Sequence, residues 1–450
     1  MKSAQLWSAL LLNSLPLLLL FLLPFNIPLS VFAAKYAKYG SLNPYLIAVA
    51  FGFSAYLWID WWIRFQHFFS KDAHLKIWMI FALLISFLIR IVFFPFESDD
   101  YCNALSMWFD FIQKNGGFQA LSKGNFSDYN VLYLYIIALL TYLPFRDLYA
   151  IKLVSVLFDY ASAYVVYKIV RLFFQNSSLR PVIAGIAILF CPTVLLNGAL
   201  WAQCDMMYVF FLLWATYFFI KQPSSGSQIV FFFTWAFLFK LQAVFFALPL
   251  LYGYCLGFIR KRHLSIFAGL WFLTCLPAWL LGRSWIDMAL IYIRQIGRSH
   301  PLSLNAPSIY QIVSHAPTTM FKYAGILLVI FIILSMILYF LAYRPRLTPQ
   351  ERFVLVMLSL GWIPYLLPQM HERYFFGVDV LSVIYIFLFP TYWYRGTLLI
   401  FCSFMSYQPY LFQTTPVPLL VLSLLYGYTL ITISIQWFQS IHFKGVESQS

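Results

Sequence analysis

The sequence predicts an all-α polytopic membrane protein, and three observations support that fold class. Of all residues, 62% are hydrophobic and only 10% are charged, whereas a soluble domain carries roughly 25% charged residues. The mean hydropathy is +0.80. The apolar residues gather into about 13–15 segments, most of them near the ~20 residues that a helix needs to cross a bilayer. We therefore predict a bundle of transmembrane helices.

The candidate spans are apolar runs bounded by charged or turn-forming stretches. In chain order they cover residues 6–24, 43–64, 76–95, 150–170, 181–199, 206–221, 228–239, 243–259, 265–283, 320–342, 353–368, 376–391, 396–412 and 416–437. One further run, "VLYLYIIALLTYLPF" at 131–145, is short. It could cross the bilayer, or it could lie at the surface as a half-helix.

Basic loop residues decide between these two topologies. If the amino terminus is inside and 131–145 does not cross, many basic residues of the short loops fall inside, including "RKRH" at 260–263. Basic residues in short loops are enriched on the cytoplasmic side. A crossing segment would invert every later loop, so we predict that 131–145 does not cross. The net charge of +14 is then explained by orientation, and no RNA-binding motif favours a nucleic-acid partner.

The chain divides into three expected parts. Residues 1–75 hold two N-terminal helices, 76–390 a membrane core, and 391–450 the C-terminal helices with a short cytoplasmic tail. The first helix is followed by "VFAAK", which resembles a signal-peptide cleavage site near Ala33. Because further spans follow it, we expect this helix to be retained.

Five polar segments interrupt the apolar pattern, and the predicted topology brings all of them to the outer face. They are "ESDD" at 97–100, "WAQCD" at 201–205, "FKLQ" at 239–242, "GRSHPLSLNAPSIY" at 297–310 and "PQMHERYFF" at 368–376. Each segment could also be explained without a function. Carboxylates are common at helix ends, Lys side chains often snorkel towards the membrane surface, and a His side chain usually pairs with its neighbours. Five such segments on one face nevertheless favour a functional site, since ionisable residues near a membrane core are costly.

The outer face therefore offers both acids and cations, partly in two long outer loops near 97–130 and 284–315. The acids are Asp99, Asp100 and Asp205, and the cations are Lys240, His371 and Arg373. A carboxylate can take a proton from a hydroxyl group. Cations can bind a phosphate and stabilise it as a leaving group.

These segments carry a family resemblance. The blocks "ESDDYCN", "NGALWAQCDMMY", "FKLQAVFFALPLL", "HPLSLNAPSIY" and "MHERYFF" occur in the order of the GT-C glycosyltransferases. The chain most resembles bacterial mannosyltransferases related to the second mannosyltransferase of GPI-anchor assembly, over roughly residues 76–390. It departs from the family forms "WGQxD" and "KPQ" by carrying Ala202 and Leu241. The resemblance implies a GT-C-type helical bundle with an amphipathic, catalytic first outer loop.

The resemblance also implies a reaction. Such enzymes use a sugar linked to a polyprenyl phosphate at the extracytoplasmic face, and an acid in the first outer loop deprotonates the acceptor hydroxyl. Attack on the anomeric carbon then inverts its configuration. Asp99 or Asp100 would be this base, with Asp100 slightly favoured. Lys240, His371 and Arg373 would hold the donor phosphate. Asp205 and Gln203 would contact either sugar hydroxyls or a basic partner, and Gln242 and Asn305 are secondary candidates for substrate binding.

Other expectations complete this hypothesis. A mannose-like hexose would pass to a lipid-linked glycan, a lipid or a protein, with no cofactor and no metal, although carboxylates could bind Mg²⁺ or Mn²⁺. The resemblance suggests a bacterial plasma membrane with the active site outside. The alternatives are a glycan ligase or polymerase, which typically has a larger basic outer loop, and a lipid or sugar transporter. Transporters usually show internal repeats and midplane sites, and we find no repeat.

Overall fold

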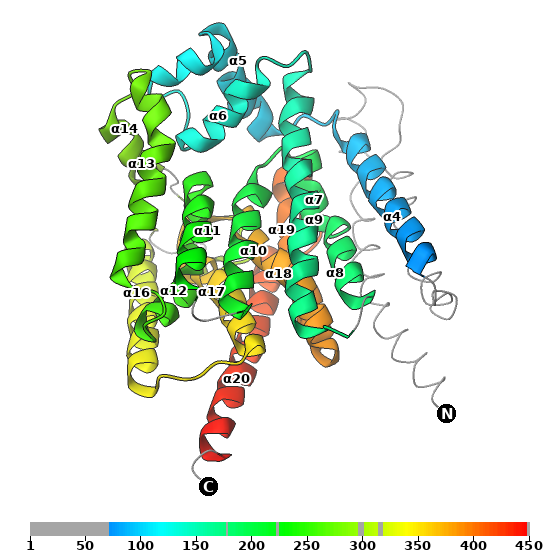
Figure 1. Cartoon of the computed structure of the whole chain (residues 1–450), viewed down its shortest axis with the longest axis vertical. Coiled ribbons are helices and arrows are strands. Elements are labelled where there is room, and N and C mark those ends of the chain that lie inside the picture. Colours follow the sequence, from blue (N-terminus) through cyan, green and yellow to red (C-terminus); the bar gives the residue numbers. More distant parts are fainter. Residues whose placement is uncertain (1–71, 177–178, 222–224, 296–300, 314–317, 448–450) are drawn as a thin grey trace.

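The computed structural model describes residues 72–176, 179–221, 225–295, 301–313 and 318–447. Over this part the protein is a helical bundle, apart from two very short strands (Figure 1). The two spans expected before residue 65 and the alternative cleavage site near Ala33 lie outside the described residues.

The first half of the described chain includes the acidic loop after α4 and the "WAQCD" segment before α10. Its elements are α4 (Asp72–Phe93), η2 (Tyr101–Leu105), α5 (Ser106–Lys114), η3 (Gly117–Ser122), α6 (Val131–Leu140), α7 (Asp147–Phe173), α8 (Leu179–Leu189), α9 (Pro192–Leu195), η4 (Leu196–Leu200), α10 (Asp205–Lys221) and α11 (Gly226–Phe239). Among them η2 and η4 are single π-helical turns, which often occur at functional sites.

The second half closes the bundle. Its elements are η5 (Leu241–Phe246), α12 (Ala247–Cys255), η6 (Lys261–His263), α13 (Leu264–Leu280), α14 (Trp285–Ala289), α15 (Ile291–Gln295), β1 (Ser303–Leu304), η7 (Ile309–Gln311), α16 (Thr318–Tyr343), α17 (Pro349–Leu366), β2 (Met370–His371), η8 (Glu372–Phe375), α18 (Phe376–Leu388), η9 (Pro390–Tyr392), α19 (Trp393–Phe412) and α20 (Leu419–Glu447). Strands β1 and β2 pair in parallel.

Among the described residues, four helices are long and apolar enough to cross a membrane by themselves. They are Asp147–Phe173, Lys261–Leu280, Thr318–Tyr343 and Leu419–His442. The other predicted spans that lie within the described residues also form helices, but these are shorter or more polar. The protein is thus an all-α polytopic membrane protein, as its composition predicts.

The segment predicted as one span at 181–199 is in fact broken. Helices α8 and α9–η4 meet at an angle of 48° across a short gap. Pro192 begins the second piece, and proline cannot donate the helical hydrogen bond and clashes with the preceding turn. The break aims the end of η4, and the "WAQCD" segment after it, into the interior of the bundle.

The segment 131–145 contributes only the ten-residue helix α6, which is about 15 Å long at 1.5 Å per residue and too short for a bilayer core of ~30 Å. It lies with α5 across one end of the bundle, at the same end as α14 (Figure 1). This agrees with the prediction that 131–145 does not cross. As expected, α5 is amphipathic: it buries Phe109 and Ile112 and exposes Met107.

A large hydrophobic core joins the described helices on both sides of residue 390. It extends from Phe96, shortly after α4, to Trp437 in α20. The C-terminal end of α20 projects from the end of the bundle opposite α5 and α6 (Figure 1). The helices before and after residue 390 are therefore packed as one body around the cavity described next.

Candidate active site

A polar cavity of about 290 Å³ lies where four of the five polar segments meet. Its walls come from the acidic loop after α4, the "WAQCD" segment, the Lys240 turn and the segment around β2. The lining residues are Asp100, Ala104, Leu105, Trp108, Asp128, Tyr129, Asn130, Tyr133, Ala202, Gln203, Cys204, Phe239, Lys240, Gln242, Tyr292, Gln295, His371, Arg373 and Tyr374. The cavity thus combines charged groups with a wall of aromatic rings.

Asp100 is the centre of this cavity's hydrogen bonding. From the described residues, its Oδ2 accepts bonds from Trp201 Nε1 (3.0 Å), Gln203 Nε2 (2.6 Å) and Arg373 Nη1 (2.9 Å). Its Oδ1 accepts a bond from the Tyr410 hydroxyl at 2.6 Å. Charge-assisted bonds of this kind hold a side chain in one geometry.

The surroundings of Asp100 also set its protonation. Burial raises its pKa, but the charge of Arg373, the hydrogen bond from Tyr410 and the charges of His371 and Lys240 outweigh burial, so the pKa is lowered from 3.8. Asp100 is therefore a carboxylate at neutral pH. It can accept a proton, but its partners keep it a weak base in the ligand-free protein.

Asp99 and Asp100 stand at the start of a helical turn. The Ser98 hydroxyl accepts a bond from the amide of Tyr101 at 3.2 Å, as a helix-capping serine does. Successive helical side chains diverge by about 100°. Consequently Asp100 lines the cavity, whereas Asp99 is exposed and is absent from its lining.

Lys240 and Asp205 form a second, deeper charge pair. The Lys240 ammonium donates to Asp205 Oδ1, and their side chains are only 8% and 1% exposed. Asn197 Nδ2 donates to the other carboxylate oxygen at 2.8 Å. Lys240 ends α11 because it takes an extended conformation (φ −154°, ψ 138°), so it marks the turn that the sequence predicts. Of the two roles proposed for Asp205, the structure displays the contact with a basic partner.

The segment around β2 brings His371 and Arg373 to the cavity. Residues Ser303–Leu304 pair with Met370–His371, and Asn305 forms an isolated bridge with His371. Asn305 is not among the cavity's lining residues, so its backbone holds His371 while its side chain stays outside the predicted binding site.

Histidine 371 differs from the expected cation. Burial, together with the charge of Arg373, lowers its pKa to about 3, so the imidazole is neutral at pH 7 in the ligand-free protein. The adjacent Glu372 is buried, and burial raises its pKa to about 8. Asp100 and Arg373 line the cavity as one ion pair, Lys240 lines it as the partner of Asp205, and Asp128 adds a further carboxyl side chain to the lining.

The two glutamines of the predicted site line the cavity in different ways. Gln203 is committed to Asp100 through its amide nitrogen. Gln242 is 8% exposed, and among the described residues no group donates to its Oε1. A buried amide oxygen without a donor is costly, so Gln242 is suited to a hydroxyl group brought by a ligand.

Ala202 stands where the resembled family has glycine, and the structure explains that preference. Its φ is +66°, a left-handed conformation that glycine adopts freely and that costs other residues roughly 1–2 kcal/mol. This bend turns the chain from Trp201 towards Gln203, so both can reach Asp100.

We expect Ala202→Gly to raise the free energy of unfolding by about 1 kcal/mol, because it relieves the left-handed strain. Thermal unfolding in detergent or lipid measures the change. Ala199→Gly, in the preceding π-helical turn, is a control that should destabilise, since glycine is unfavourable within a helix and Ala199 lies in η4. Destabilisation by both substitutions would contradict the strain argument.

Sequence reasoning missed several lining residues and one partner of Asp100. Tyr410 is in α19, about three hundred positions from Asp100, within the part expected to lie outside the core. Trp201 was part of a noted segment but had no assigned role; it stacks on Tyr410 (centroids 5.0 Å apart) and lies under the Arg373 guanidinium. Aromatic residues are too frequent in this chain, at 21%, for their pattern to single these out.

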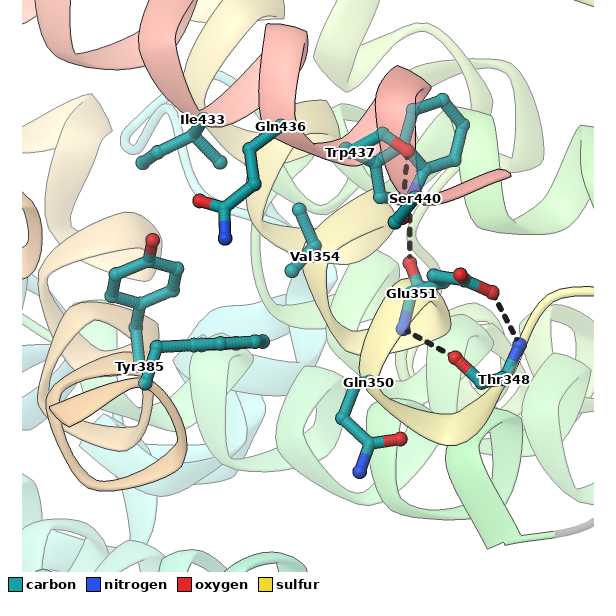
Figure 2. A pocket seen from close by; sticks show the side chains of 10 residues that line it. Thr348, Gln350, Glu351, Val354, Tyr385, Ile433, Gln436, Trp437 and Ser440 are labelled. Carbon is teal, nitrogen blue, oxygen red and sulfur yellow. Dashed lines mark hydrogen bonds between the residues drawn. The ribbon is translucent and has the colours of Figure 1, made fainter. Parts of the chain in front are cut away.

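A second cavity, of about 300 Å³, lies between α17, α18 and α20 (Figure 2). Its one charged lining residue is Glu351. Figure 2 shows Glu351 and Thr348 exchanging hydrogen bonds at the start of α17, with Trp437 donating to the Glu351 carbonyl. These bonds satisfy the helix start, so the cavity offers little for binding a charged ligand.

The described residues contain no group of three or more His, Cys, Asp or Glu side chains arranged to hold a metal ion. At the main cavity Asp100 pairs with Arg373, and Asp205 pairs with Lys240.

Residues 128–281 match a family model described as dolichyl-phosphate-mannose-protein mannosyltransferase. The match runs from the end of the acidic loop to the end of α13 and includes Gln203, Asp205, Lys240 and Gln242. Asp100 and Arg373 lie outside it. No curated protein matches the chain. The matched stretch and the polar cavity thus coincide in the "WAQCD" segment and the Lys240 turn.

Proposed function

We propose that this chain is a membrane glycosyltransferase of the GT-C type, which transfers a mannose-like hexose from a polyprenyl-phosphate sugar to an acceptor hydroxyl. The observation that carries the proposal is the contact between Asp100 and Arg373 at 2.9 Å inside one polar cavity. A base and a phosphate-binding cation are thereby held within reach of one substrate.

In the proposed reaction Asp100 takes the proton of the acceptor hydroxyl. The acceptor oxygen forms a bond to the anomeric carbon while the bond from that carbon to the phosphate oxygen breaks, which inverts the configuration. The negative charge that develops on the leaving phosphate is stabilised by Arg373 and Lys240, both of which line the cavity. Gln242 and the aromatic wall contact the hexose.

Arg373 links donor binding to the strength of the base. In the ligand-free protein its guanidinium lowers the pKa of Asp100. A donor phosphate competes for that guanidinium and adds a negative charge to the cavity. Both effects raise the pKa of Asp100 and of His371. Donor binding therefore makes Asp100 a better base and favours a protonated His371 beside the phosphate.

This mechanism predicts different pH profiles for kcat and kcat/KM. The acid limb of kcat/KM reports the pKa of Asp100 in the free enzyme, where it is lowered from 3.8. The acid limb of kcat reports the pKa of Asp100 in the donor complex. We expect the acid limb of kcat to lie at the higher pH, because the bound phosphate raises that pKa. Initial rates over donor concentration and pH measure both limbs. Coincident limbs would show that the phosphate leaves Asp100 unaffected.

We also propose that the cavity faces the extracytoplasmic side of a bacterial plasma membrane. Cys102, close to Asp100, is exposed, and Lys261 in the "RKRH" loop is exposed at a predicted cytoplasmic position. With Cys102 as the sole cysteine, we expect a membrane-impermeant maleimide to label intact cells. A sole cysteine from Lys261→Cys should react only after permeabilisation. The opposite result would invert the topology.

A transfer assay tests the function. Purified protein in lipid nanodiscs is given radiolabelled polyprenyl-phosphate mannose or glucose, with a lipid extract as acceptor. We expect label to enter a new product from the mannose donor, with the anomeric configuration inverted. If neither donor supports transfer, while a polyprenyl-pyrophosphate glycan does, the enzyme is a ligase or polymerase. Lipid movement without transfer would identify a transporter.

A further inference from the structure

Helix α7 carries a buried polar stripe that the proposed reaction does not use directly. Lys152, Ser155 and Asp159 are at most 1% exposed. Their spacing places them on one face of the helix. Polar groups inside an apolar helix are costly unless they find partners, so the partners indicate what the stripe holds.

Lys152 holds the end of α4, directly before the acidic loop. Its ammonium donates to the carbonyls of Phe93 (3.0 Å), Phe94 (3.0 Å) and Phe96 (2.6 Å). All three donors of the ammonium are thereby used. The last carbonyls of a helix carry partial negative charge, so a buried cation fixes where the loop begins.

One turn further along α7, Ser155 holds the "WAQCD" segment. Its hydroxyl donates to the Gln203 carbonyl at 2.8 Å, and the Gln203 side chain donates to Asp100. Gly198 of η4 fits closely here, since a Cβ on it would lie 3.3 Å from Ser155 Cβ. Below them Asp159 pairs with Arg90 of α4 at 3.0 Å.

From these contacts we propose that Lys152 and Ser155 are positioning residues, which set Asp100 against Gln203 by holding both chain segments on one helix face. The inference rests on the proposed function, because it concerns the geometry of its base. Neither residue touches the cavity. Each acts through the backbone of the segment that it holds.

Ser155→Ala is the primary test, because it removes one hydroxyl and keeps the packing. We expect kcat to fall about ten- to a hundredfold, the order that small misplacements cost, with little change in the KM for the donor. The acid limb of kcat/KM should move to higher pH, since Asp100 loses the aligned Gln203 donor that stabilises its charge. Ser162→Ala is the matched control: Ser162 is buried on α7, and its hydroxyl has no partner among the described residues.

A double variant distinguishes a positioning role of Ser155 from a general loss of folded structure. Gln203→Leu should move the acid limb in the same direction as Ser155→Ala. Adding Ser155→Ala to Gln203→Leu should change neither kcat nor the limb further, because the group that it positions is gone. Lys152→Met should lower kcat as well, and its folding is checked by thermal unfolding. Additive effects of Ser155→Ala and Gln203→Leu would overturn the proposal.

Hydrogen–deuterium exchange gives a readout that needs no substrate. We expect faster exchange in residues 201–205 of Ser155→Ala and wild-type exchange there in Ser162→Ala. If the wild-type protein transfers no sugar, the proposed function fails, yet exchange still reports whether Ser155 holds the segment. If Ser155→Ala matches Ser162→Ala in kcat, acid limb and exchange, the positioning role is wrong.

Discussion

Asp100→Asn is expected to lower the rate of sugar transfer about 10²- to 10⁴-fold, the range that a general base contributes. The amide keeps the size of the side chain but cannot take the acceptor's proton. Asp100 lines the cavity and accepts bonds from Gln203, Arg373 and Tyr410. Single-turnover transfer with a saturating donor measures the loss directly.

The neighbouring acid supplies the control. Asp99 is exposed and does not line the cavity, so Asp99→Asn should retain transfer within about tenfold, well above the loss expected for a base. Thermal unfolding and donor binding must show that Asp100→Asn is folded, since it weakens a pair with the largely buried Arg373. If Asp99→Asn loses transfer and Asp100→Asn keeps it, the base is Asp99 and our assignment is reversed.

Breaking the pair of Lys240 and Asp205 is expected to have the largest effect on stability. Removing one partner of a buried ion pair costs about 3–5 kcal/mol, because the remaining charge is buried without compensation. Lys240→Met leaves Asp205, which is 1% exposed, with the side-chain amide of Asn197 as its hydrogen-bond donor. Thermal or denaturant unfolding in lipid or detergent measures the loss.

The double variant Lys240→Met with Asp205→Asn should recover most of that stability, since no unpaired charge remains. It should not recover transfer, because the cation proposed for the donor phosphate is absent. The exposed pair of Lys114 and Asp110 on α5 provides a matched control, and Lys114→Met should have no measurable effect. If the double variant restores transfer, Lys240 is structural and binds no phosphate.

Several features of the site were predictable from residue types and their positions. The basic loops predict that the acidic loop, the "WAQCD" segment and the Lys240 turn share one face, and these segments meet in one cavity. The end of α11 at Lys240 follows from polar residues interrupting a run too long for one helix. These predictions depend on local hydropathy and charge, which the sequence displays directly.

Other features depend on contacts between distant segments. Tyr410 reaches Asp100 only because α19 packs beside the "WAQCD" segment. The neutral state of His371 results from burial beside Arg373, and a sequence pattern does not indicate how deeply a loop histidine lies. The broken span at Pro192 was read as one helix, because its hydropathy is continuous across the proline.

The sequence by itself determined that this is a helical membrane protein with acids and cations gathered at one end, because composition and loop charge govern insertion into a bilayer. The tertiary structure alone decided which acid meets which cation. Asp100 pairs with Arg373, and Asp205 with Lys240. Such pairing depends on distances of a few ångströms between segments far apart in the chain, and those distances are set by helix packing, breaks and buried anchors such as Lys152.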